Sequence, residues 1–116
     1  MRRFRSHRVG VDQGSSVLFS DHIDGGPMWT GSGAREFRFP VTFSEAYVDP
    51  PVVQVSMTMW DSDHQTNQRV DIQPEEITET GFTIVFRTWG DTRIARVRAS
   101  WTAIGEIRDE DDWDLY

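Results

Sequence analysis

The chain has 116 residues, a formal net charge of −7 at pH 7 and no cysteine. A chain of this length forms one domain and leaves no room for a second independent core. Without cysteine the fold has neither disulfides nor a thiolate-held zinc ion. The acidic balance argues against a nucleic-acid partner, because affinity for phosphate needs a basic face.

Charges of opposite sign collect at the two ends of the chain. Basic residues crowd the start, at Arg2, Arg3, Arg5 and Arg8. Acidic residues crowd the end, at Glu106, Asp109, Glu110, Asp111, Asp112 and Asp114. We interpret residues 1–7 as a basic tail, residues 8–107 as the domain and residues 108–116 as an acidic tail, both tails being solvated. The alternative is that the tails pair with each other or dock a partner.

The basic start is not followed by the apolar stretch of roughly 7–15 residues that a signal peptide needs. No window approaches the roughly 20 apolar residues of a membrane span. We therefore expect a soluble protein without a signal peptide. Its localisation stays open, and release by another route and association with a particle are two of the alternatives.

Between the ends, apolar residues recur at every second position, which is typical of strands with one buried face. In chain order this pattern predicts strands at 17–19, 36–43, 53–59, 70–72, 82–86 and 95–101. Pro40 has no amide hydrogen, so the second of these strands is expected at a sheet edge or with a bulge.

Turn residues separate these segments, at Asp24–Pro27, Asp49–Pro51, Thr80–Gly81 and Trp89–Thr92. Gly90 is suited to a positive φ, and Glu75–Ile77 could form one helical turn but nothing longer. The spacing of the six segments predicts an all-β fold, a six-stranded antiparallel β-sandwich.

The densest polar run is Trp60–Arg69, which follows an expected buried strand and so predicts a loop at one end of the sandwich. Binding residues often lie on such loops, although a plain hydrophilic turn is equally consistent. A calcium loop would need glycine at its sixth place and an acid at its twelfth, where this run has Thr66 and Ile72. His64 alone cannot hold zinc. We expect no metal and no cofactor.

The segment Arg87–Arg93 places Trp89 beside Gly90 at what the sequence predicts to be a hairpin tip. An exposed ring there suits the apolar face of a sugar, and nearby charged groups can hold hydroxyls through charge-assisted hydrogen bonds. The alternative is a tryptophan folded back over the end of the sandwich. No glycosidase carboxyl pair and no Ser-His-acid triad is recognisable, so we do not expect an enzyme.

Several short segments together resemble the H-type lectins, the family of N-acetylgalactosamine-binding agglutinins and their bacterial relatives. These segments are Gly25–Gly31, Pro50–Val53, Ser56–Thr58, Asn67–Val70, Thr80–Phe82, Thr88–Trp89 and Ser100–Ile104. The resemblance implies a six-stranded sandwich that assembles as a trimer, with shallow sugar sites in clefts between subunits. It also implies that Arg69 contacts the sugar and that Trp89 stacks on it.

Other positions depart from the family's pattern. Ser32 stands at the position of the family's key aspartate, and Thr30 stands where the family has a nearby backbone contact to the sugar. Gly90 stands where the animal agglutinins have a histidine. Serine offers a hydroxyl but cannot accept a hydrogen bond as a charged group does. The missing charge is expected from one of three other acids, namely Asp61, Asp63 or Asp91.

These observations predict a lectin that recognises surface glycans of the N-acetylgalactosamine or galactose type. The alternative is a structural module, such as the spike or fibre head of a phage-like particle, in which sugar binding is degenerate.

Overall fold

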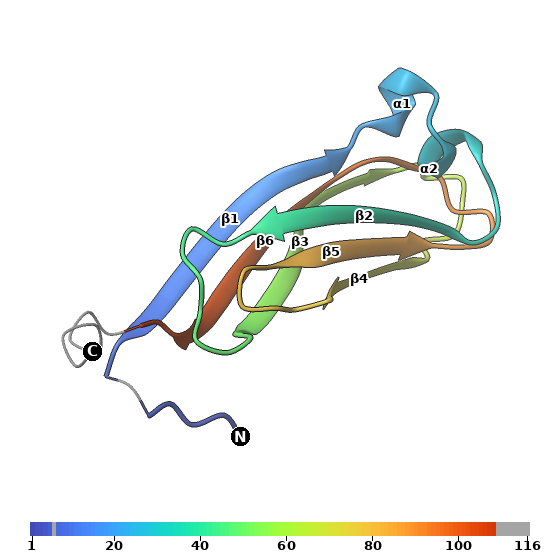
Figure 1. The fold of residues 1–116 in the computed structure, drawn as a ribbon. Coiled ribbons are helices and arrows are strands. Elements are labelled where there is room, and N and C mark those ends of the chain that lie inside the picture. The colour runs from blue at the N-terminus through green and yellow to red at the C-terminus, as the bar shows by residue number, and fades with distance from the viewer. Residues whose placement is uncertain (6, 109–116) are drawn as a thin grey trace.

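The computed structural model describes residues 1–5 and 7–108 and has six strands in two antiparallel sheets (Figure 1). The strands are β1 (Val9–Phe19), β2 (Arg35–Thr42), β3 (Val52–Ser62), β4 (Val70–Glu75), β5 (Gly81–Thr88) and β6 (Ile94–Glu106). Sheet A has the strand order β1-β6-β3, and sheet B has the order β2-β5-β4. The prediction of an all-β, six-stranded antiparallel fold is confirmed.

The alternation of apolar and polar residues decides which side of each strand is buried. On β6, Val97, Ala99, Trp101 and Ala103 are buried, while Arg98, Ser100 and Thr102 alternate with them and face outward. On β5, Phe82, Ile84 and Phe86 face the same interior. Because β6 and β5 are the central strands of their sheets, their inner faces form the middle of the core.

Aromatic rings fill the end of the core that lies away from the short helices. Phe43 contacts Tyr47, Phe82 and Trp101, with ring centroids 5.1, 5.7 and 5.9 Å apart. Gly14 lies opposite Trp101 on the neighbouring strand, where a Cβ would come within 2.6 Å of the indole nitrogen. The absence of a side chain at Gly14 therefore allows the large ring to lie flat against β1.

Most connections cross between the sheets, and only the one from β4 to β5 stays within a sheet. The segment that holds Trp89 therefore joins sheet B to sheet A, and the prediction of a hairpin tip there is wrong. The period-two pattern locates β5 and β6 correctly but carries no information on which strands pair.

Other sequence predictions also need correction. The first strand is β1, which begins at Val9 and is much longer than Val17–Phe19. Glu75 ends β4 and Glu76 has a φ of 52°, so no helical turn forms there. The turn predicted at Asp24–Pro27 connects two short helices that the sequence pattern does not predict, α1 (Asp21–Asp24) and α2 (Pro27–Thr30). Pro40 lies in β2 at the edge of sheet B, as expected.

The two ends of the described chain lie side by side. The backbone amide of Arg5 donates to the Glu106 carboxylate over 2.7 Å, and the amide of Ile107 donates to the carbonyl of Arg8 over 3.2 Å. Ser6 and residues 109–116 lie outside the described residues. The division into tails at 1–7 and 108–116 stays a prediction.

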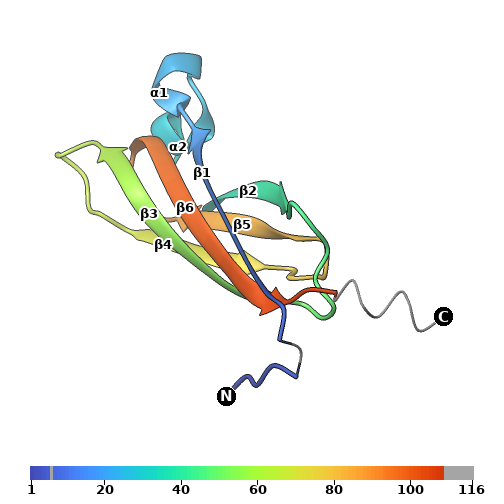
Figure 2. The ribbon, with the colours of Figure 1, turned by 90° about the vertical axis from the view of Figure 1, so that its left-hand side faces the viewer.

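The two sheets lie in separate layers (Figure 2), and their outer faces differ in chemistry. On sheet B, Arg38 and Arg87 form ion pairs with Glu36 and Glu75, at N–O distances of 2.7–3.8 Å. On sheet A, three consecutive cross-strand rows contain no charged residue. These rows are Val11–Ile104–Val52, Gln13–Thr102–Gln54 and Ser15–Ser100–Ser56.

Candidate functional site

Three connections meet at the end of the sandwich that bears α1 and α2 (Figure 1). They are the segment after α2, the loop from β3 to β4 and the crossover from β5 to β6. Backbone hydrogen bonds join them: the amide of Gly33 donates to the Gly90 carbonyl, and the amide of Asp63 donates to the Arg93 carbonyl, both over 2.9 Å. The three segments therefore form one connected surface.

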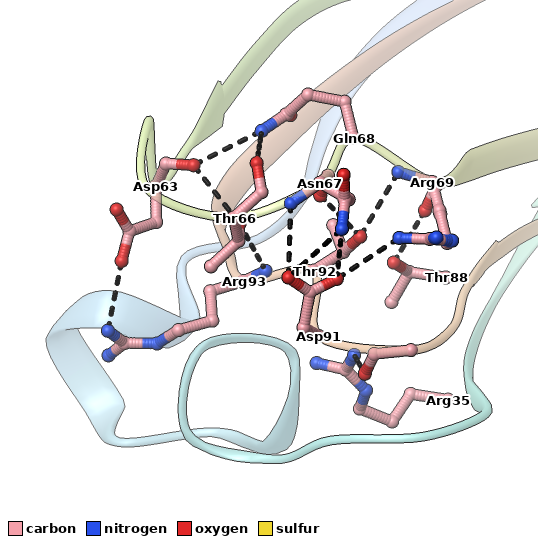
Figure 3. Close-up of polar contacts among 11 residues, drawn as sticks. Arg35, Asp63, Thr66, Asn67, Gln68, Arg69, Thr88, Asp91, Thr92 and Arg93 are labelled. Carbon is pink, nitrogen blue, oxygen red and sulfur yellow. Dashed lines mark hydrogen bonds and ion pairs between the residues drawn. The ribbon is translucent and has the colours of Figure 1, made fainter.

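Two buried threonines fix the backbone around Arg69 (Figure 3). The hydroxyl of Thr88 donates to the Arg69 carbonyl over 2.6 Å. The hydroxyl of Thr92 accepts from the Arg69 amide over 3.1 Å and donates to the Asn67 carbonyl over 2.6 Å. Because Thr88 and Thr92 are almost fully buried, the start of β4 is held from inside the fold.

The side chain of Arg69 points outward and is paired with Asp91. Their N–O distance is 3.1 Å, and the Arg69 side chain is 40% exposed. Such a pair leaves several guanidinium N–H groups open to a ligand, since the group has five donors in a planar fork. Asp91 thereby fixes the direction of a cation that still faces solvent.

Asp91 also accepts hydrogen bonds from Asn67. The backbone amide of Asn67 donates over 3.2 Å, and its side-chain amide donates over 3.2 and 3.3 Å. The backbone bond first, then the side-chain bond and the charge of Arg69, lower the pKa of Asp91 below its ordinary value of 3.8. The carboxylate is therefore charged across the physiological range.

We expect the contacts of Asp91 with Arg69 and Asn67 to be lost by protonation only well below neutral pH. A lowered pKa means that the ionised Asp91 stabilises the fold above the ordinary pKa, and that this contribution is lost as pH falls through the lowered value. The contacts of Asp91 should thus be unchanged from about pH 5 to about pH 8. Following the Asp91 carboxyl carbon by NMR during titration measures the midpoint, and a value at or above the ordinary 3.8 would contradict the geometry.

Gly90 lies between Arg69 and the segment that follows α2. Its φ of 69° is the left-handed conformation expected of the glycine there, and a Cβ would lie 3.4 Å from the Arg69 side chain. Its neighbour Trp89 is 45% exposed, so the ring is not folded into the core. The crossover thus carries an accessible aromatic ring two residues before Asp91, the partner of Arg69.

Arg35 ties the segment after α2 to the crossover. Its guanidinium donates to the carbonyl oxygens of Gly33, Pro27, Met28 and Gly90, at 2.9–3.3 Å. The hydroxyl of Thr30 donates to the Gly26 carbonyl over 3.0 Å, within the helix region. Ser32 is exposed beside Gly33 and so lies close to Gly90.

Asp61 and Asp63 are engaged away from this group. Asp63 pairs with Arg93 over 3.0 Å, and Arg93 also stacks on Trp29, 4.2 Å from the ring centroid. Asp61 lies within β3, because that strand extends to Ser62, and it pairs with Arg96 over 3.3 Å. The predicted loop from Trp60 to Arg69 therefore begins only at Asp63. Of the three acids considered from the sequence, Asp91 is the one that pairs with Arg69.

The structure thus brings together Arg69, Asp91, Trp89 and Gly90, with Ser32 and Thr30 on the adjoining segment. Sequence reasoning did not single out Arg35, Thr88, Thr92 or Asn67 as site residues. Asn67 lies two residues before Arg69 and is named from the sequence only as the start of the segment Asn67–Val70. Arg35 and the two threonines act through partners distant in sequence.

The described residues contain neither a metal-binding cluster nor a membrane-spanning helix. Among residues 1–5 and 7–108, no group of three or more His, Cys, Asp or Glu side chains is placed to hold a metal ion. In that same part of the chain, none of the helices has the length and apolar character needed to cross a membrane.

Comparison with known proteins relates this fold and surface to a family. Residues 38–104 match the H-type lectin domain family. The chain is 62% identical over 107 residues to a Fuscovulum blasticum protein named for the ATP synthase subunits region, ORF 7, covering 92% of this chain and 93% of that protein. That name describes a region and gives no activity.

A second relative is a discoidin. A discoidin-1 polypeptide of Dictyostelium discoideum is 39% identical over 75 residues, which is 64% of this chain but only 30% of that protein. The chain therefore spans less than a third of the length of this discoidin-1 polypeptide.

Solved structures share the fold. Discoidin II of Dictyostelium discoideum superposes with a TM-score of 0.75 at 19% identity, over 93% of this chain and 40% of that one. The tailspike protein gp49 of Pseudomonas phage LKA1 superposes with a TM-score of 0.54 at 19% identity, over 85% of this chain and 15% of that one. Because the family match covers more than half of the chain, this protein belongs to the H-type lectin domain family, which supports carbohydrate binding in general.

Proposed function

We propose that this protein is a lectin that binds surface glycans of the N-acetylgalactosamine or galactose type, at clefts between the subunits of a trimer. The observation that carries the proposal is the Arg69–Asp91 pair beside the exposed ring of Trp89. Arg69 would donate to sugar hydroxyls, Trp89 would pack on the apolar face of the ring, and Ser32 would add a hydroxyl from the adjoining segment.

In this proposal, Asp91 supplies the carboxylate that the family has at the position of Ser32. It lies against Arg69 in the same chain, and its oxygens can accept from a sugar hydroxyl as well as from Asn67 and Arg69. Asp61 and Asp63 do not serve this role in the proposal, because each is paired with a different arginine.

The trimer is supported by the outer face of sheet A. Val11, Val52 and Ile104 are 64%, 48% and 39% exposed and lie side by side in one cross-strand row. An exposed apolar row next to two uncharged rows is typical of a surface that another protein covers. In contrast, the ion pairs across sheet B suit contact with water.

The experiment is a glycan array probed with the intact protein and with Arg69→Ala. We expect binding to a defined class of neutral sugars, and at least about a tenfold loss in the variant, the size expected when a charged hydrogen-bond donor is removed. The fold should survive, because the threonine bonds at position 69 involve only its backbone.

Arg38→Ala is the matched control. Its side chain is 38% exposed and ion-paired, much like that of Arg69, but it lies on the outer face of sheet B. Retained binding in Arg38→Ala separates the effect of the site from the loss of any surface arginine. Loss of the trimer in Arg69→Ala would instead assign this residue to a subunit interface.

A second candidate function is an assembly module of a phage-like particle. It is motivated by the fold shared with a part of a phage tailspike, a likeness that concerns the fold alone. A correctly folded trimer that binds no glycan on the array would favour this candidate over the lectin.

A further inference from the structure

A pocket lies beside Trp89, and Arg69 is not among its lining residues. It has a volume of about 280 Å³ and is lined by Ala34, Arg35, Glu36, Arg87, Thr88 and Trp89. Arg69 immediately precedes β4, on one side of β5, whereas residues 34–36 lead into β2 on the other side. Trp89 follows the central strand β5, so the backbone at Trp89 lies between Arg69 and residues 34–36.

We propose that this pocket is a subsite for a second sugar, and that the protein takes neutral glycans of at least two residues. The inference rests on the proposed lectin function and extends it across Trp89. The volume of about 280 Å³ lies just below that of drug-sized ligand pockets, which run from roughly 300 to 1,000 Å³, so it suits a single further sugar ring. Because Trp89 lines the pocket and is exposed, a sugar in the pocket would lie next to the sugar that packs on Trp89.

The lining offers groups that a sugar can use. Each Glu36 carboxylate oxygen accepts one arginine N–H over 3.1 Å, from Arg38 on one oxygen and from Arg87 on the other. A carboxylate has about four acceptor positions, so further positions stay available for sugar hydroxyls. The small side chain of Ala34 leaves space at the other wall.

The arginines of the pocket are committed to internal partners. Arg87 pairs with Glu75 over 2.7 Å and with Glu36 over 3.1 Å. Arg35 donates to four carbonyl oxygens that hold the neighbouring segments together. Arg87 is already paired with two carboxylates, and Glu36 adds a negative charge to the lining. A sialic acid or sulfate group would compete with these carboxylates and be repelled by Glu36, so the pocket favours neutral sugars.

The test uses the full-length protein in calorimetric titrations. The probes are the methyl glycosides of galactose and N-acetylgalactosamine, neutral disaccharides that end in these sugars, and the sialylated forms of the disaccharides. We expect the better neutral disaccharide to bind about fivefold more tightly than its terminal monosaccharide, the gain from one net neutral hydrogen bond. Sialylation should remove that gain.

Ala34→Phe fills the pocket without touching the Arg69–Asp91 pair. Because Ala34 is exposed, the substitution should not affect folding. It should abolish the fivefold gain and leave monosaccharide affinity unchanged. Ala46→Phe, at an exposed alanine of the connection from β2 to β3, is the matched control and should keep the gain.

The outcomes separate the two proposals. If the wild-type protein binds the sugars but Ala34→Phe keeps the disaccharide gain, the subsite is wrong and the lectin stands. An equal loss of monosaccharide binding in Ala34→Phe would place the pocket in the first sugar's site and also overturn the subsite. Tighter binding of sialylated probes would overturn its preference for neutral sugars. Absence of binding by wild-type protein to every probe would count against the lectin itself.

Discussion

Ile104→Glu is expected to convert the proposed trimer into single folded chains. Ile104 is at the centre of the apolar row on sheet A, between Val11 and Val52, and it is 39% exposed in the single chain. A carboxylate there costs little in an isolated chain, because the site is open to water. In an interface, three such charges would be buried near apolar side chains without partners.

Light scattering after size exclusion measures this change directly as a threefold drop in mass. The apparent affinity for a glycan-coated surface should fall by about 10²-fold or more, because the gain from multivalent binding is lost. Gln73→Glu is the control, since it places the same charge on the outer face of sheet B. A trimer that persists in Ile104→Glu would show that sheet A does not form the interface.

Thr92→Val should destabilise the fold by about 2–3 kcal/mol, because two backbone groups lose a hydrogen-bond partner. Valine keeps the shape of the fully buried Thr92 side chain but removes its hydroxyl. The Arg69 amide and the Asn67 carbonyl then each lose a partly buried hydrogen bond, and an unsatisfied group of this kind costs about 1–3 kcal/mol. The position of Arg69 depends on the same two bonds, so glycan affinity should fall as well.

Urea unfolding measures the first effect through the shift of the midpoint at constant slope. Thr42→Val is the control, because Thr42 is an exposed threonine at the end of β2, and it should change the free energy of unfolding by less than about 0.5 kcal/mol. An unchanged midpoint for Thr92→Val would mean that water satisfies both groups, and that Thr92 does not position Arg69.

The strands were predictable where one face is buried and the other is exposed to solvent. Val53, Val55 and Met57 alternate with polar residues, and so do Ala95, Val97 and Ala99, because each strand contributes a single face to the core. Which strands pair with one another could not be predicted from the local pattern. Trp89 and Gly90 look like a hairpin tip by local pattern, yet β5 and β6 belong to different sheets, which is decided by contacts far apart in the sequence.

In the candidate site, too, some residues could be predicted from the local sequence and others depend on the fold. Arg69 and Trp89 stand out locally, as a cation and a large ring next to turn residues. Which acid accompanies Arg69 depends on the fold, because Asp61, Asp63 and Asp91 each have an arginine within reach. The supports of the site, Arg35 and Thr92, act across 55 and 25 residues of sequence. No local pattern distinguishes them from other polar residues of a β-protein.

The hydrogen bonds of Arg35 have a consequence for how sugar preference could diversify on this scaffold. Its guanidinium contacts carbonyl oxygens of Pro27, Met28, Gly33 and Gly90, and every amino acid supplies such an oxygen. Arg35 therefore holds the backbone of the segment that carries Ser32 through contacts that do not depend on the side chains of that segment. Substitutions at Ser32 can change the hydroxyls recognised while the loop keeps its course, so specificity can vary independently of loop shape.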